Sequence, residues 1–166
     1  LGGAVAQVPV GWLADKFDRR VVLIWLSVAS TLACALTVAS VGGGVVAIFL
    51  AAGFFGFTTF PIYSVSAAHA HDFAESHERV ELSAALMFLY AVGAIASPLI
   101  ASVLIAGFGP GAMFAFLALS HAGLVVFGLV RMRARPSPGA RTGYTYVPRT
   151  SFLIGRLLGR GRDEDR

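Results

Sequence analysis

The sequence predicts an all-α membrane protein, a bundle of helices that cross the bilayer. Of its 166 residues, 57% are hydrophobic and 13% are charged, and the mean hydropathy is +0.76. A soluble globular domain carries about 25% charged residues, so a soluble fold of this composition would expose large apolar patches. The charges also cluster between long apolar runs. These runs are too long, and alternate too little in polarity, for the strands of a β-barrel.

Five apolar runs make up the predicted transmembrane region, residues 1–135. Residues 1–13 would extend roughly 20 Å as a helix, which is short of a hydrocarbon core of ~30 Å. Together with the opening Leu-Gly-Gly, this short run predicts that the chain is a fragment that begins inside a span. Four full-length spans without Asp, Glu, Lys or Arg follow, at about residues 21–41, 45–68, 82–106 and 112–130.

The segments between the runs alternate between charged and uncharged. Residues 11–20 and 69–81 are charged loops, whereas Gly42–Gly44 and Gly107–Gly111 form uncharged glycine-rich turns. Further arginines follow the last run, starting at Arg131. Basic residues mark the cytoplasmic side of a membrane protein, so the charged loops and the C-terminus are expected there.

The C-terminal tail, residues 136–166, is polar with one apolar patch. The patch predicts a short amphipathic helix at about residues 151–159, lying on the inner leaflet. A disordered basic tail is the alternative. Aromatic and basic residues do not interleave as they do in nucleic-acid-binding proteins, so the bilayer is the expected partner of these charges and no nucleic acid is expected.

The first charged loop carries the most specific pattern. Residues 11–20 read Gly-Trp-Leu-Ala-Asp-Lys-Phe-Asp-Arg-Arg, or G-x-L-A-D-K-x-x-R-R. This pattern resembles the cytoplasmic signature loop of the major facilitator superfamily of secondary transporters. Asp18 stands where the family usually has glycine. An ordinary charged hairpin between two spans is the alternative interpretation.

The resemblance implies a twelve-helix fold in which two six-helix halves rock about a central site and move a small-molecule solute, often with protons. Four spans and a tail after the loop fit helices nine to twelve. The chain is then most of the C-terminal half, in a bacterial inner membrane, and its partner is the missing N-terminal half of the same chain. Because no span holds a carboxylate, a proton-coupling acid would lie in the missing part, or the carrier is a uniporter.

The resemblance also implies a cytoplasmic gate, since such a loop holds helix ends together in one transport state. The residues expected to form it are Gly11, Asp15, Lys16, Arg19 and Arg20. The acidic second loop supplies the expected partners of Arg19 and Arg20, through weak exposed pairs. These partners are Glu75, Glu78 and Glu81.

Hydroxyl groups within the spans predict a solute path. Three of them recur at i, i+4 and i+7 on one face of the second full-length span, and the resemblance implies that this helix and the next line the central cavity. The alternative is that each hydroxyl bonds to its own helical backbone. The candidate residues are Thr59, Tyr63, Ser66, Tyr90 and Ser97.

Other titratable groups favour structural roles. His121 lies deep in the last span and is expected to be neutral and bonded to a neighbouring helix. The histidines near Asp72 lack a clear fourth ligand, so neither a metal nor a cofactor is expected. No nucleophile has a base beside it, which argues against an enzyme.

Two functions therefore remain open: a secondary transporter, or a small four-span scaffold or oligomer-forming protein without transport activity. A hydroxyl-lined wall fits sugars, drugs and metabolites equally well.

Overall fold

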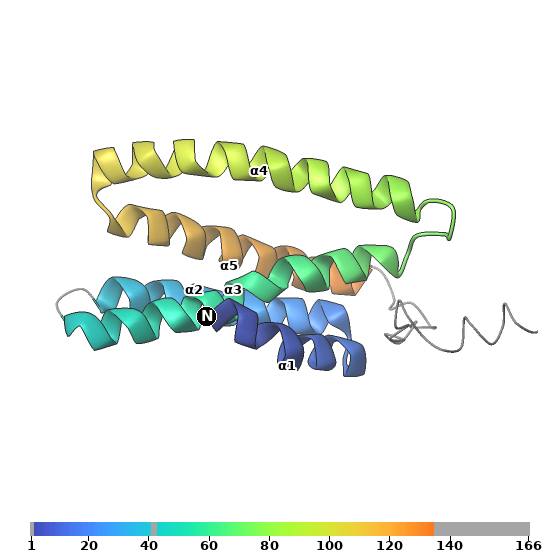
Figure 1. The fold of residues 1–166 in the computed structure, drawn as a ribbon, viewed down its shortest axis with the longest axis horizontal. Coiled ribbons are helices and arrows are strands. Elements are labelled where there is room, and N and C mark those ends of the chain that lie inside the picture. Colours follow the sequence, from blue (N-terminus) through green and yellow to red (C-terminus); the bar gives the residue numbers. More distant parts are fainter. Residues whose placement is uncertain (1, 41–42, 135–166) are drawn as a thin grey trace, which may run out of the picture.

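The computed structural model describes residues 2–40 and 43–134, and this part of the chain consists of five α-helices joined by short turns (Figure 1). The all-α membrane fold is confirmed, since four of the helices are long and apolar enough to cross a membrane. The predicted tail helix at residues 151–159 lies outside the described residues. The five helices are α1 (Gly2–Lys16), α2 (Arg19–Ala39), α3 (Gly44–His71), α4 (Arg79–Phe108) and α5 (Gly111–Ala134).

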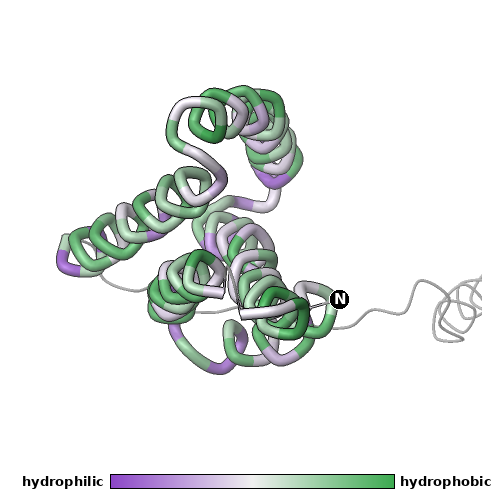
Figure 2. The backbone as a smooth tube through the Cα atoms, turned by 90° about the vertical axis from the view of Figure 1, so that its left-hand side faces the viewer, coloured by the Kyte–Doolittle hydropathy of each residue, from purple (hydrophilic) through white to green (hydrophobic). Residues whose placement is uncertain are grey.

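Successive helices run in alternating directions, so the two charged loops and the end of α5 lie at the same end of the bundle (Figure 1). We call this the charged end. Lys16 and Arg131 both lie there, as the alternation of loop charge requires. Figure 2 shows apolar residues along the helices and hydrophilic ones mainly near the helix ends, the distribution expected of helices that face lipid.

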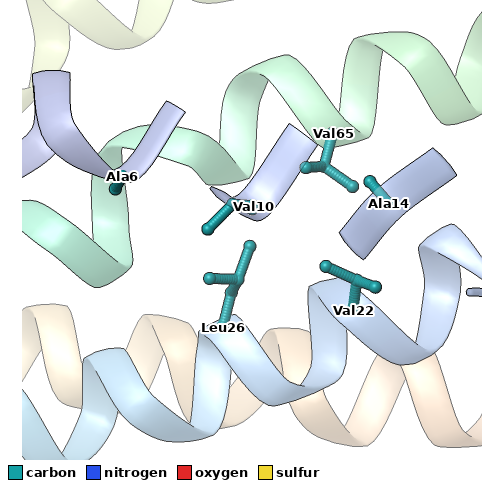
Figure 3. Packing of buried hydrophobic residues seen from close by; sticks show 6 residues of the cluster. All are labelled: Ala6, Val10, Ala14, Val22, Leu26 and Val65. Atoms are coloured by element: carbon teal, nitrogen blue, oxygen red, sulfur yellow. The ribbon is translucent and has the colours of Figure 1, made fainter. Parts of the chain in front are cut away.

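Helix α2 occupies the centre of the packing, with extensive contacts to α3 and α5, while α1 packs mainly on α3. A small core joins α1, α2 and α3 through Ala6, Val10, Ala14, Val22, Leu26 and Val65 (Figure 3). The residues from α1 are small, which lets the helices approach closely without help from the hydrophobic effect. At Gly2, a Cβ atom would lie 2.2 Å from the carbonyl oxygen of Gly53. Backbone contact between α1 and α3 therefore requires glycine at this crossing.

Helix α4 stands apart from the other helices (Figures 1 and 2). It contacts α3 and α5 only lightly, and it has no buried residue. Apolar side chains such as Met87, Ile95 and Val103 are largely exposed around it. A helix that is apolar on all sides needs lipid or further helices around it.

Candidate functional site

The signature loop is a tight turn between α1 and α2, and Asp18 begins the second helix. The Asp18 backbone has φ −62° and ψ 119°, and its carboxylate accepts a hydrogen bond from the backbone N–H of Arg20 at 3.0 Å. The same carboxylate pairs with the Arg20 guanidinium at 3.3 Å. This turn needs no positive φ at Asp18, so glycine is not required there. Aspartate at this N-cap position adds a side-chain hydrogen bond that glycine could not make.

Arg19 connects the loop to the end of α3. Its Nη1 donates to Asp72 Oδ1 at 2.5 Å and to the carbonyl oxygen of Ala68 at 3.0 Å. Its Nη2 pairs with Asp15 Oδ1 at 3.3 Å. The side chains of Arg19 and Asp72 are only 11% and 6% exposed, so this pair is largely withdrawn from water. We call Asp15, Arg19 and Asp72 the loop network.

The structure thus gives Arg19 a different partner from the predicted glutamates. Asp72 follows directly after α3, which packs beside the loop, whereas the glutamates lie in the turn that leads out to α4 and in its first residues. There, Glu75 pairs with His77 at 3.5 Å and Glu78 accepts a hydrogen bond from the backbone of Glu75 at 3.1 Å. Glu81 is exposed on α4.

The other members of the predicted gate lie around the same turn. The ammonium group of Lys16 lies 4.8 Å from the centroid of the Trp12 ring, a cation–π contact. Gly11 has nothing within 4 Å of where its Cβ would lie, so in the described part of the chain no neighbouring helix requires glycine there. Among the described residues, no group of His, Cys, Asp and Glu could hold a metal ion.

A cavity of about 810 Å³ lies beside the loop network, between α1 and α3. Its wall is mainly apolar, as in most small-molecule sites, with a few polar side chains. Within it, the Ser64 hydroxyl donates to Gln7 Oε1 at 3.3 Å. Gln7 lies about 14 Å along α1 from Lys16. The polar lining residues are Gln7, Asp15, Arg19, Ser64, His71, Asp72 and Arg79. The cavity therefore extends from the exposed Gln7–Ser64 pair to the charged end.

The structure places the predicted solute-path residues on different faces. Tyr63 faces α4, where its ring centroid lies 5.2 Å from that of Tyr90. Thr59 faces α2 instead, and its hydroxyl donates to the Ser30 hydroxyl at 3.3 Å.

Ser66 lines a second, smaller cavity between α2, α3 and α5. Ser97 is exposed on α4. The predicted set therefore does not converge on one site within the described residues.

Sequence reasoning missed Gln7 and Ser64. Gln7 is the only glutamine of the chain and interrupts an apolar run, and a strongly polar side chain inside a span is a functional candidate by default. That signal alone would have identified it. Ser64 follows Tyr63 in the sequence but lies on a neighbouring face of α3. The spacing of the hydroxyls along the helix could not show which of these faces lines a cavity.

His121 is buried in α5, with 7% of its surface exposed. Its Nδ1 has no hydrogen-bond partner among the described residues. The structure therefore gives this atom no bond to a neighbouring helix, in contrast to the prediction.

Known proteins match most of the chain. The family model of the Major Facilitator Superfamily matches residues 1–161. The MFS-type transporter YcaD of Shigella flexneri and that of Escherichia coli strain K12 / DH10B are each 32% identical over 116 residues, and that of Salmonella paratyphi B is 33% identical over 119 residues. No solved structure matches.

Each alignment with these relatives covers 70% of this chain and 29% of the relative. The chain thus spans less than a third of their length. Four helices able to cross a membrane agree with the multi-pass integral membrane proteins of this family. The match extends far beyond the loop at residues 11–20 on which the resemblance rested. The chain belongs to the Major Facilitator Superfamily.

Proposed function

We propose that this chain is part of a secondary transporter that moves a small solute by alternating access. It would supply one wall of the solute path and one side of a cytoplasmic gate within the C-terminal half. The observation that carries this proposal is the loop network, because it binds the signature loop to α3 directly beside a cavity whose mainly apolar wall carries a few polar side chains. The charged end then faces the cytoplasm.

The three members of the loop network differ in burial, and this difference suggests how the gate works. Arg19 and Asp72 are nearly buried, whereas the Asp15 side chain is 41% exposed. The buried pair keeps the turn fixed to α3. Asp15 is held weakly, because an exposed ion pair contributes at most about 1 kcal/mol. When the two halves rock, Asp15 is the member that exchanges Arg19 for a group on the other half.

The wall of the solute path is formed by Gln7 and Ser64 in the cavity. An amide and a hydroxyl among apolar side chains suit a solute with neutral polar groups and an apolar part. Neither group is a carboxylate. A proton-coupling acid would lie in another part of the transporter, or transport is uncoupled.

The test is transport by the full-length protein in vesicles, over a panel of solutes, with and without a proton gradient. Asp15→Ala should reduce transport while membrane insertion stays intact. Unchanged transport would remove the gate role of Asp15. Arg133→Ala is the control for loss of a charge at the charged end, because Arg133 lies in the last turn of α5, outside the predicted gate and the loop network.

The wall is tested separately by Ser64→Ala, which should raise the KM for the transported solute. Ser120→Ala is the matched control, because its hydroxyl donates to the Phe116 carbonyl oxygen of its own helix. Equal effects of the two changes would exclude Ser64 from the solute path. The alternative of a four-span scaffold without transport is not favoured, because the relatives that match this chain are named as transporters.

A further inference from the structure

The second cavity, of about 240 Å³, lies near the charged end between α2, α3 and α5. It shares no lining residue with the larger cavity. Basic or titratable side chains reach it from all three helices: Arg20 from α2, His69 from α3 and Arg131 from α5. The hydroxyls of Ser27 and Ser66 add further donors. The cavity thus combines cations and hydroxyls at one end of a membrane bundle.

The helix packing explains why this cavity exists. Helix α2 packs closely against both α3 and α5. The backbones of α3 and α5 stay farther apart and are bridged by the rings of Phe55 and Phe114, whose centroids lie 5.9 Å apart, so a wedge opens beside α2. Gly128 brings α5 close to α2, since a Cβ there would lie 2.8 Å from Ile24 Cγ1. Deeper in the wedge the wall is apolar, with Leu124 and Phe127 on α5.

The charges in and around the cavity do not cancel. No lining residue is acidic. Of the nearby carboxylates, Asp18 pairs with Arg20, and Asp72 is bound to Arg19 and lies 4.0 Å from His69 Nδ1. Arg131 forms no ion pair with any residue that the structure describes, so its positive charge is left to attract an anion.

We propose that this cavity binds the phosphate group of an anionic phospholipid. Basic pockets between spanning helices on the cytoplasmic side are sites for such headgroups. Arginine presents several donors in a plane that matches phosphate oxygens, and serine hydroxyls can complete the set. Arg131 follows directly after the last apolar run, at the depth of the headgroups, and Leu124 and Phe127 lie below it for the acyl chains. The site is independent of the proposed solute path.

The experiment is native mass spectrometry of the full-length protein in detergent, with added phosphatidylglycerol or phosphatidylcholine. Arg131→Gln should weaken phosphatidylglycerol binding about fivefold. Arg133→Gln is the matched control, because Arg133 belongs to the same last turn of α5 but does not line the cavity, and it should stay within about twofold. Ser66→Leu fills the cavity without changing charge and should also reduce binding.

Three results would overturn the proposal. Equal losses in Arg131→Gln and Arg133→Gln would mean general attraction to basic residues. Equal retention of phosphatidylcholine and phosphatidylglycerol would mean that the headgroup charge is not recognised. Binding of inorganic phosphate that depends on Arg131, in protein that retains no phosphatidylglycerol, would assign the cavity to free phosphate instead of lipid.

Discussion

Replacing Asp72 by asparagine tests the loop network most directly. The change removes the main partner of a guanidinium that is 11% exposed and whose Nε has no partner among the described residues. Removing one member of a buried ion pair costs about 3–5 kcal/mol. Arg19 keeps Asp15 and the Ala68 carbonyl oxygen, so we expect a smaller loss of about 2 kcal/mol. That loss corresponds to roughly a 30-fold change in an equilibrium constant.

The assay is the thermal midpoint of the full-length protein in detergent, measured for Asp72→Asn, Arg19→Gln and the double variant. The double variant should be more stable than the sum of the single losses predicts, because it leaves no buried charge without a partner. Glu75→Gln is the control and should change little, since its side chain is 76% exposed. Strictly additive losses would refute the coupling between Arg19 and Asp72, and with it the attachment of the loop to α3.

Three further predictions use the same thermal assay. Asp18→Ala and Asp18→Gly both remove the pair with Arg20, but Asp18→Gly should be less destabilising by about 0.5–1 kcal/mol, because glycine is a better N-cap than alanine; equal losses would contradict the capping role. Gly128→Ala should destabilise by about 1–3 kcal/mol through overpacking against Ile24, whereas Gly123→Ala, with open space around it, should be nearly neutral. His121→Leu should leave stability unchanged or raise it by about 1 kcal/mol, because it removes a buried polar atom without a partner among the described residues; a clear loss would reveal a partner elsewhere in the protein.

Fold class and family could be predicted from the sequence because both depend on local patterns. Long runs without charge must be helices in a bilayer, where every backbone polar group needs a partner within its own segment. The loop at residues 11–20 has a fixed spacing of charges, and this spacing can be read from the sequence without knowing how the helices pack. Both signals can be read without placing one helix beside another.

The contacts of the site could not be predicted, because they depend on which faces meet. Helix α3 carries polar groups on several faces and is almost uniformly apolar otherwise, so its periodicity does not show that Thr59 faces α2 while Ser64 faces α1. Likewise, several carboxylates of the second charged loop could pair with Arg19 as far as the sequence shows. Asp72 is the one that does, because the end of α3 lies beside Arg19.

The detachment of α4 has a mechanical consequence. This helix is joined to the bundle by a turn at each end. It touches α3 through the tilted rings of Tyr63 and Tyr90 and through a contact of 3.3 Å between Ser83 Oγ and His71 Nε2. Because α4 has no buried residue, it can move as a unit relative to the other helices without exposing buried apolar side chains. Displacing it would cost the aromatic contact, about 0.5–1.5 kcal/mol, together with the contact between Ser83 and His71 and its light packing on α5.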